Sequence, residues 1–393
     1  MTNGIPLARP FFGPEEEAAV REVLHSGWVS QGPKVEEFEK RLADLLGCRE
    51  VCAVNSGTSA LMLTLRGLGV GPGDSVVVPA LSCAATALPV LETGARLLFA
   101  DIDPATFNVT WDTIAAVLAP DTKAVIAVHM FGQAAEIDVV ATECRRRNLA
   151  LVEDTALAFG ARKAGRLAGT FGVAGCFSFH PRKILTTGEG GAVCTNDPAL
   201  AANIRADRNY GAARTAWARF QTGDGSPCGF SRLAFNCKLT DLQAAVGLAQ
   251  LARLPQFLSQ RRHIAQRYAD QLSSCCCLIP PRLPASLEEH VFQAYVCTWA
   301  DGPLVDLAAD AGALQAAERR LNRFKESLRQ RDVAVSDAAQ YLPELPVFEQ
   351  GRVPSLFPGA YAASRLAFAI PIFPGMTESQ IDQVVEAICS AAQ

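Results

Sequence analysis

The chain has 393 residues, of which 36 are Lys or Arg and 40 are Asp or Glu, giving a formal net charge of −4, and 49% of the residues are hydrophobic. A single hydrophobic core rarely grows beyond about 250–300 residues, so this length favours one large and one smaller domain. The nearly balanced charge argues against a nucleic-acid-binding protein, and the high apolar content excludes a disordered chain.

The N-terminus and the cysteines bear on the cellular compartment. Residues 1–10 contain no basic segment followed by an apolar stretch, and the longest apolar run, 76–91, is interrupted by Pro79 and Pro89. We therefore expect an untargeted, soluble protein without a membrane span. The 13 cysteines include an adjacent trio at 275–277, which is not typical of a disulfide framework and favours the reducing cytoplasm. The five histidines are isolated from one another and none lies beside a Cys pair, so we expect no metal site.

Short apolar strands alternate with helical patterns between about residues 51 and 194, which is typical of a mostly parallel sheet covered by helices. The strands are predicted at 51–54, 75–78, 96–99, 124–128, 149–153, 175–179 and 192–195. The helices between them are predicted at 58–66, 84–91, 111–118 and 137–146. We expect an α/β fold with helices on both faces of the sheet, in which ligands bind at the carboxyl ends of the strands.

After Leu239 the pattern changes to longer helices, followed by a Pro-rich passage that indicates the junction to a smaller α+β domain. The two helices and the Pro-rich passage are predicted at 241–252, 255–273 and 279–284. The smaller domain is expected to contain a strand at 294–299 and helices at 317–331 and 378–391. We divide the chain into a large domain with an N-terminal arm, 1–254, and a smaller C-terminal domain, 255–393.

The first motif with chemical potential joins a strand end to a helix start rich in hydroxyl groups, Asn55-Ser56-Gly57-Thr58-Ser59. Free N–H groups at the N-terminus of a helix and the neighbouring hydroxyls form an anion site, with phosphate as the expected ligand. The alternative is an ordinary N-capped helix, because Ser and Thr favour that position in any case.

Two acids, Glu153 and Asp154, follow the apolar residues of the strand that begins at residue 149. At the ligand-binding edge of a parallel sheet, at least one of these carboxylates is expected to face the site. The alternative is an acidic strand end that caps the next helix.

The third motif, 177–191, contains Ser178 and Lys183 between aromatic residues and a Gly-Glu-Gly-Gly turn. Glycines allow close approach of the backbone to a ligand, and an amine held among apolar and hydroxyl groups can lose its proton and add to a carbonyl. The alternative for Lys183 is a surface lysine in a loop.

The three motifs together match the requirements of pyridoxal 5′-phosphate (PLP). The helix N-terminus would hold the phosphate, the carboxylate would keep the pyridine nitrogen protonated, and the lysine would form a Schiff base with the aldehyde. Their combination, in this order along the chain, is more specific than any single motif.

At these residues the sequence resembles the DegT/DnrJ/EryC1/StrS family of sugar aminotransferases, which are fold-type I PLP enzymes acting on nucleotide-activated keto sugars. The matching segments are Ser26 to Pro33, Asn55 to Leu61, Val128 to Gln133, Glu153-Asp154, Ser178 to Gly191, and Asn236 with Thr240 to Ala245. The resemblance covers about residues 5–270, weakens over 280–355 and returns at 366–377.

The resemblance implies a role for each matched residue. Lys183 corresponds to the lysine that binds PLP and moves the substrate proton, Asp154 to the partner of the pyridine nitrogen, and Ala156 to a residue packed against the ring. The residues that correspond to phosphate ligands are Gly57, Thr58 and Ser178. Asn236 corresponds to an asparagine presented to the phosphate by the neighbouring subunit, which implies a homodimer with shared active sites.

Three positions depart from the family pattern. Cys83 stands where many members have an aromatic residue that stacks on the ring, and a thiol cannot stack in this way. Leu157 replaces a glutamine that bonds the phenol oxygen of the cofactor, and a leucine donates no hydrogen bond. Lys238 replaces an arginine and supplies a point charge instead of a planar fork. These departures suggest a divergent subgroup.

We therefore expect an aminotransferase that moves an amino group from an amino acid, with L-glutamate as the expected donor, to the ketone of a nucleotide-linked keto-deoxysugar. A cyclitol or another secondary-metabolite ketone is the alternative acceptor. A third hypothesis is a non-catalytic regulator of the same fold, which should lack the lysine or carry a DNA-binding segment. Neither feature is found, because Lys183 is present and no such segment is recognised.

Overall fold

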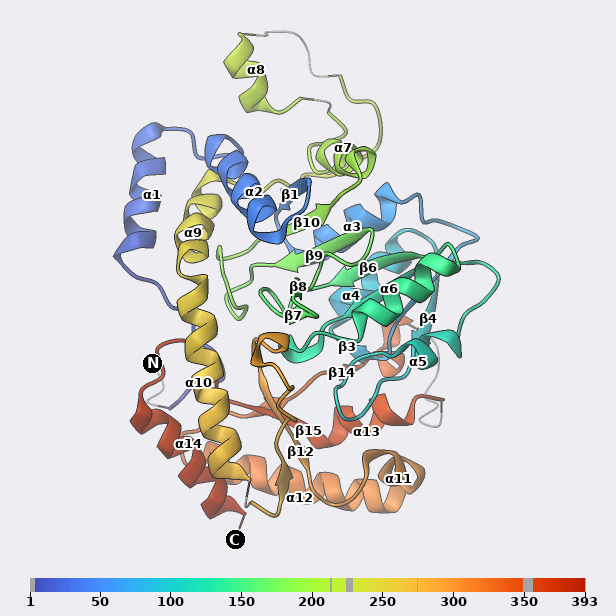
Figure 1. The fold of residues 1–393 in the computed structure, drawn as a ribbon, viewed down its shortest axis with the longest axis vertical. Helices are drawn as coiled ribbons and strands as arrows, with labels where there is room; N and C mark the ends of the chain where they lie inside the picture. The colour runs from blue at the N-terminus through green and yellow to red at the C-terminus, as the bar shows by residue number, and fades with distance from the viewer. Residues whose placement is uncertain (1–3, 213, 224–228, 274, 349–355, 393) are drawn as a thin grey trace.

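The computed structural model describes residues 4–212, 214–223, 229–273, 275–348 and 356–392. A seven-stranded sheet occupies the centre of the molecule, with helices around it, and a smaller sheet lies toward the two termini (Figure 1).

The central sheet has the strand order β1-β10-β9-β6-β5-β2-β4. Its strands are β1 Glu50–Val54, β2 Ser75–Pro79, β4 Arg96–Ala100, β5 Thr122–Val128, β6 Ala150–Asp154, β9 Ala174–Ser178 and β10 Gly191–Thr195. The five strands from β9 to β4 are parallel, whereas β10 is antiparallel to both of its neighbours. All seven predicted strands are present, six within one residue at each end and β5 starting two residues earlier than predicted, and the expected α/β fold is confirmed.

Helices cover both faces of this sheet. The helices of this part of the chain are α1 Pro14–Ser26, α2 Pro33–Leu46, α3 Gly57–Gly67, α4 Ala84–Glu92, α5 Trp111–Ala115, α6 Ile137–Arg146, α7 Pro198–Asp207, α8 Ala216–Thr222, α9 Asp241–Ala252 and α10 Leu254–Leu272, of which α8 projects away from the sheet and α10 extends toward the C-terminal part (Figure 1). Alternate residues of β1 belong to two different hydrophobic clusters: Cys52 and Val54 share one with α3, and Val51 and Ala53 share the other with α2. This alternation follows from the two-residue period of a strand, and it buries the sheet on both sides.

A second, antiparallel sheet lies in the C-terminal part of the chain, with the order β11-β12-β15-β13. Its strands are β11 Leu278–Ile279, β12 Tyr295–Trp299, β13 Ser336–Asp337 and β15 Ala367–Ile370. The helices of this part are α11 Leu304–Ala309, α12 Ala311–Arg329, α13 Pro358–Leu366 and α14 Glu378–Ala391. The division of the chain between residues 254 and 255 stays a prediction.

Two predicted helices differ from the observed ones. The helix expected at 111–118 ends at Ala115, and the chain then turns ahead of Pro120 to enter β5. The helix expected at 317–331 begins at Ala311, because the Asp310 carboxylate caps it by accepting the N–H groups of Gly312 and Ala313 at 2.9 and 3.0 Å.

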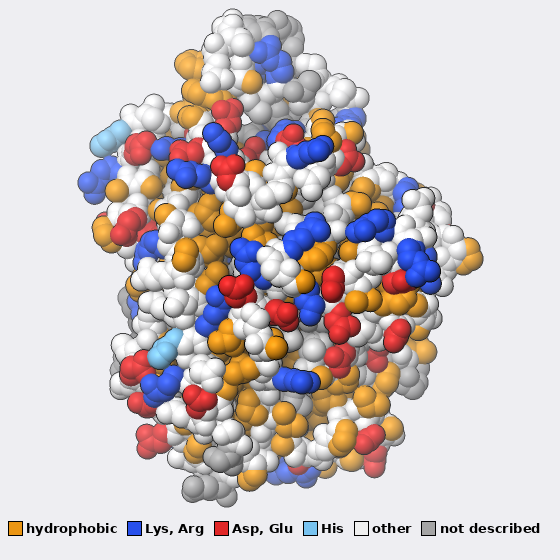
Figure 2. All heavy atoms as spheres, in the orientation of Figure 1, with side chains coloured by type: hydrophobic (Ala, Val, Ile, Leu, Met, Phe, Trp, Pro, Cys, Tyr) orange, Lys and Arg blue, Asp and Glu red, His pale blue; other side chains and the backbone are white. Residues whose placement is uncertain are grey.

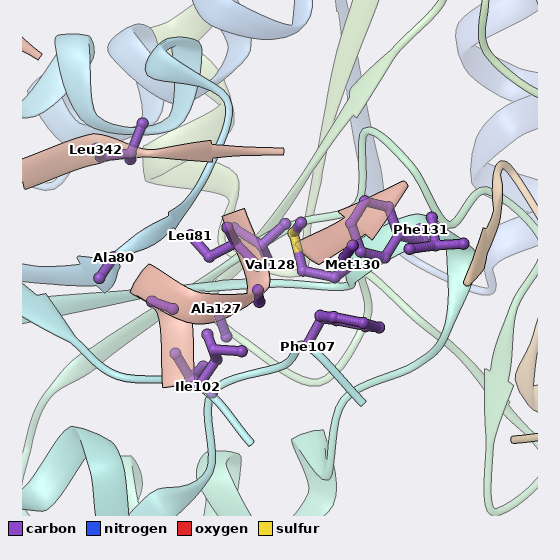
Figure 3. Packing of buried hydrophobic residues seen from close by; sticks show 14 of the residues in the cluster. Ala80, Leu81, Ile102, Phe107, Ala127, Val128, Met130, Phe131 and Leu342 are labelled. Carbon is purple, nitrogen blue, oxygen red and sulfur yellow. The ribbon is translucent and has the colours of Figure 1, made fainter. Parts of the chain in front are cut away.

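A short antiparallel pair connects the two parts of the chain. Strand β3, Leu81–Ser82, follows β2, and it pairs with β14, Gln340–Tyr341. The Leu342 N–H donates to the Ala80 carbonyl at 2.8 Å, and both residues belong to the same hydrophobic cluster as Leu81, Val128 and Met130 (Figure 3). This packing holds residues 340–342 beside the carboxyl end of β2. A further two-stranded hairpin consists of β7 Arg162–Lys163 and β8 Arg166–Leu167.

The surface carries charges of both signs. Lys and Arg side chains alternate with Asp and Glu over the face seen in Figure 2, without a large patch of one sign. Within the described ranges, none of the helices has the combination of length and apolar content that would let it cross a lipid bilayer.

The buried imidazole of His290 leads to a prediction about acid stability. Burial, aided by the charge of Arg262, lowers the pKa of His290 from 6.5 to about 3, and the ring accepts the Phe292 N–H at 2.8 Å. Below pH 6.5 His290 is therefore protonated in the unfolded chain but stays neutral in the folded chain. The free energy of unfolding should fall with decreasing pH, by at most about 1.4 kcal/mol per unit from this residue.

Urea unfolding of the wild type and of His290→Asn, at several values between about pH 4 and 6, measures this contribution. Asparagine keeps an acceptor for the Phe292 N–H but does not titrate, so the variant should show the shallower pH dependence. Parallel pH dependences of the two proteins would show that His290 titrates normally.

Candidate active site

Asp154 lies at the carboxyl end of β6, beside Val128 at the end of β5 and Cys176 in β9. Its side chain is anchored on both oxygens, since the Thr86 hydroxyl donates to Oδ2 at 2.9 Å and the Ala156 N–H donates to Oδ1 at 3.1 Å. The hydroxyls of Thr86 and Ser82 are themselves 2.9 Å apart. This chain of hydroxyls fixes the carboxylate at the edge of the sheet where ligands bind in this architecture.

Glu153, although adjacent in sequence, has a different role. It is fully buried and accepts hydrogen bonds from the backbone N–H groups of Gly169, Phe171 and Gly172 at 2.6–2.7 Å. His129 Nε2 lies 3.0 Å from the same carboxylate, while Nδ1 accepts the Ala135 N–H. Because Nδ1 is an acceptor, Nε2 carries the hydrogen and donates a hydrogen bond to Glu153. Glu153 therefore holds together the loop after β6, and Asp154 is the acid that is free to serve a ligand.

The N-terminus of α3 lies against the end of β9. Ser56 caps the helix, its hydroxyl accepting the Ser59 N–H at 3.0 Å, so the N–H groups of the first turn at Gly57 and Thr58 have no partner within the helix. A Cβ atom on Gly57 would lie 2.8 Å from Ser178 Cβ. The structure thus places Gly57 and Ser178 next to each other at the N-terminus of α3, with the exposed Thr58 beside them.

This contact predicts that Gly57→Ala weakens PLP binding. The added methyl group must displace Ser178, and overpacking of this kind costs about 1–3 kcal/mol, or roughly tenfold to a hundredfold in affinity. Absorbance titration of the apoprotein with PLP measures the change. Gly71→Ala is the matched control, since its Cβ would come no nearer than 3.8 Å to another residue, at the Thr93 oxygen. Equal affinities of the two variants would contradict the prediction.

Lys183 lies on the loop between β9 and β10. The loop is held by its own hydrogen bonds, from the Lys183 N–H to the His180 carbonyl at 2.8 Å and from the Thr187 N–H to the Phe179 carbonyl at 3.0 Å. Burial lowers the pKa of the Lys183 amine, and the negative charge of Asp154 opposes part of this shift. An amine with a lowered pKa is a better nucleophile near neutral pH.

Lys183 lines a cavity of about 860 Å³ between the two parts of the chain. Cys83 and Leu157 line it from the large sheet's side, and Gln293 and Gln340 from the C-terminal side. The other lining residues are Leu7, Ala8, Ser82, Met130, Phe131, Arg182, Ala294, Ser336, Asp337, Ala338, Ala339, Tyr341, Glu344, Leu345, Ser364, Arg365, Ala369 and Ile370.

The remaining predicted residues lie apart from the lining of this cavity. Ala156 follows Asp154 on the loop after β6. Asn236 is exposed, and its carbonyl accepts the Asn55 side-chain amide at 3.4 Å. Lys238 Nζ lies 4.0 Å from the centre of the Tyr210 ring. Sequence reasoning did not identify Ser82, Thr86, Gln293 or Gln340, because their positions depend on contacts with distant segments. No group of three or more His, Cys, Asp or Glu side chains within the described ranges is arranged to hold a metal ion.

These residues fit PLP. The space between Gly57 and Ser178 would be filled by a side chain at residue 57, Asp154 is fixed by two donors, and Lys183 is a half-buried amine with a lowered pKa. The Spr1654 protein of Streptococcus pneumoniae, solved in a PLP form, matches the structure with a TM-score of 0.87 at 25% identity, covering 99% of this chain and 98% of that one. The protein is a fold-type I PLP-dependent transferase.

Comparison of the sequence with known proteins identifies the family within this class of transferases. The DegT/DnrJ/EryC1/StrS aminotransferase family matches residues 11–389. The spore coat polysaccharide biosynthesis protein SpsC of Bacillus subtilis (strain 168) is 32% identical over 391 residues, 98% of this chain and 96% of that protein. The dTDP-4-dehydro-2,3,6-trideoxy-D-glucose 4-aminotransferase of Saccharopolyspora spinosa is 33% identical over 402 residues, 99% of this chain and 97% of that protein. The chain belongs to the DegT/DnrJ/EryC1/StrS aminotransferase family and is a PLP-dependent transaminase, as the sequence predicted.

Proposed function

We propose that the protein transfers an amino group from an amino acid, L-glutamate, to the ketone of a nucleotide-linked keto-deoxysugar. The observation that carries this proposal is the half-buried Lys183 with its lowered pKa, in a cavity roomy enough for a large substrate and with Asp154 as its electrostatic neighbour. The relative from Saccharopolyspora spinosa supports the class of acceptor, since its name specifies a dTDP-linked keto sugar.

Each site residue has a proposed part in binding the cofactor. Lys183 would hold the PLP aldehyde, and Asp154 would accept a hydrogen bond from the pyridine nitrogen. The N–H groups of Gly57 and Thr58 and the Ser178 hydroxyl would bind the phosphate at the positive end of α3. When bound, PLP withdraws electrons from the substrate carbon and carries the amino group from donor to acceptor.

The residues around the ring complete the proposal. Cys83 and Ala156 would pack against the ring, and Leu157 would contribute an apolar contact without a hydrogen bond. The Lys183 amine would move a proton to and from the substrate carbon. For this the amine must be uncharged, which its burial favours by lowering its pKa.

A homodimer with shared active sites is part of this proposal. Asn236 is exposed in the single chain, and apolar side chains on the same segment are exposed as well: Phe230 to 65%, Leu233 to 81%. A second copy of the chain would cover these groups and receive Asn236 at its phosphate site. We also propose a cytoplasmic location, which the cysteine pattern favours.

Mixed dimers test the sharing. If Asn236 acts across the interface, a dimer of one Lys183→Ala chain and one Asn236→Ala chain has one unaltered site and one doubly altered site. Random mixing of the chains should then restore about a quarter of wild-type activity, although each parent is impaired. If mixing leaves the activity at the mean of the two parents, Asn236 does not act across the interface.

The substrate is tested with the purified enzyme, L-glutamate, and a panel of nucleotide-linked keto sugars and inosose-type cyclitol ketones. Turnover of a nucleotide-linked keto sugar, with 2-oxoglutarate as the second product, is the expected result. Turnover of cyclitol ketones alone would replace the sugar by the cyclitol as acceptor. Failure to develop a visible absorption band with added PLP would favour the non-catalytic regulator.

A further inference from the structure

Gln293, which sequence reasoning did not identify, lies between the C-terminal part of the chain and the loop of Lys183. Its backbone is held firmly. The buried guanidinium of Arg261 donates to the Phe292 and Gln293 carbonyls at 2.9 and 3.3 Å. The Ala294 N–H donates to the Phe131 carbonyl at 3.3 Å. The backbone that carries the Gln293 side chain is therefore fixed by hydrogen bonds on both sides.

Gly132 permits this arrangement. Its φ of +100° suits glycine, and a Cβ atom there would lie 2.8 Å from the Gln293 backbone nitrogen and 3.1 Å from the Leu157 carbonyl oxygen. The backbone around Gln293 can therefore approach the large sheet closely, beside the loop that follows Asp154.

The side-chain amide of Gln293 has a fixed orientation. Its Nε2 donates to the carbonyl oxygen of Arg182, in the peptide group that leads into Lys183. Because a carbonyl can only accept, the amide cannot be reversed, and Oε1 must point the other way. Gln293 thus ties the C-terminal part of the chain directly to the backbone of the lysine.

The oxygen of the same amide is unsatisfied. Gln293 is 7% exposed, and within the described residues its Oε1 is buried without a hydrogen-bond partner, although the residue lines the same cavity as Lys183. Leaving a buried amide oxygen unpaired is unfavourable, and such atoms in native proteins usually meet water or a ligand. The cavity is the side from which a donor can reach it.

From these contacts we propose that Gln293 is a positioning residue with two functions. Its Nε2 holds the Lys183 loop, and its Oε1 accepts a hydrogen bond from an O–H or N–H group of the bound substrate. Occupation of the cavity is thereby linked to the placement of the lysine. This inference rests on the proposed function, because it takes Lys183 as the residue that holds PLP.

Gln293→Leu tests both functions, because leucine retains an apolar side chain of similar length but makes neither hydrogen bond. In the PLP-loaded enzyme without substrate, the pH midpoint of the visible absorbance change should shift relative to the wild type, since the lysine is no longer held. Gln340→Leu is the control for this readout. Gln340 lines the same cavity, but its amide oxygen contacts the Ala84 N–H at 3.4 Å and not the lysine loop, so its midpoint should not move.

Separate measurement of the two half-reactions identifies which substrate group donates a hydrogen bond to Oε1. If only the KM for the keto sugar rises, by about tenfold to a hundredfold, the group is a sugar hydroxyl. If only the KM for L-glutamate rises by this factor, the group is its ammonium. An unfolding temperature of Gln293→Leu close to that of the wild type excludes general misfolding. If this temperature is clearly lower, Gln293→Asn is the second variant, with the same expected results.

An unshifted midpoint together with unchanged KM values in both half-reactions would overturn the proposal for Gln293. Failure of the proposed function is a separate result, because then the wild type itself would either give no absorbance change with PLP or transfer no amino group to a nucleotide-linked keto sugar.

Discussion

Replacement of Lys183 by alanine should abolish both covalent binding of PLP and amino transfer. Without the amine, PLP has no group with which to form the Schiff base, and the proton at the substrate carbon has no carrier. We expect kcat to fall by a factor of at least about 10⁴, the scale seen when a covalent catalytic group is removed. Treatment of the PLP-loaded protein with borohydride, followed by mass measurement, checks the covalent bond.

The control for this experiment is Lys123→Ala. Lys123 pairs with Asp74 at 3.0 Å and donates to the Gly69 carbonyl at 2.6 Å, among residues that do not line the cavity. This variant should retain a borohydride-reducible adduct. If Lys183→Ala also retains one, another lysine holds PLP.

The same lysine predicts a pH dependence of PLP attachment. Only the uncharged amine attacks the aldehyde, so the rate of adduct formation by the apoprotein should rise with pH and level off above the pKa of Lys183. Burial lowers this pKa from its ordinary value of 10.5, and the rate should therefore reach half of its plateau value below pH 10.5. Stopped-flow absorbance measurements on the apoprotein give the profile. A half-maximal rate at pH 10.5 or above would contradict the lowered pKa.

Amide substitutions of the two adjacent acids, Glu153 and Asp154, should have different effects on stability and on activity. Glu153→Gln should destabilise the fold by about 3 kcal/mol, because an NH₂ group would face backbone N–H donors in a site that is closed to water. Urea unfolding of the apoprotein measures this loss. The cofactor-binding residues are unchanged, so any folded fraction should still bind PLP.

Asp154→Asn should show the opposite pattern. Asparagine can still accept a hydrogen bond from Thr86 or Ala156, so the free energy of unfolding should change by less than about 1 kcal/mol. The charge that would hold the pyridine proton is lost, and kcat should fall by at least about tenfold to a hundredfold. If Asp154→Asn unfolds while Glu153→Gln remains stable and inactive, the roles of the two acids are exchanged.

Local sequence signals predicted most of the elements. The predicted helix 241–252 agrees with α9 because Thr240 and Gln243 form a capping box, with the Thr240 hydroxyl accepting the Gln243 N–H at 3.2 Å. The apolar strands were recognised for a similar reason, since each is a short buried run bounded by turn residues. Helices α1 and α2 were not predicted, although each begins with a proline after a glycine, Gly13-Pro14 and Gly32-Pro33.

The missed site residues depend on contacts between distant parts of the chain. Thr86 contacts Asp154 from 68 positions away, and Gln293 contacts Arg182 from 111 positions away. No periodicity or local motif contains such pairings. The same applies to β14, which pairs with β3 through main-chain hydrogen bonds that any residue type can form.

By itself, the sequence determined the kind of protein, because the order of a hydroxyl-rich helix start, an acidic strand end and a lysine loop is local and chemically specific. The strand pattern alone left the two acids equivalent, and the family resemblance pointed to Asp154 without a physical reason; the tertiary structure supplies that reason. Successive side chains of a strand point to opposite sides, and the side that becomes the site depends on what packs against each face. Here three backbone N–H groups and His129 enclose Glu153, and Asp154 remains beside Lys183.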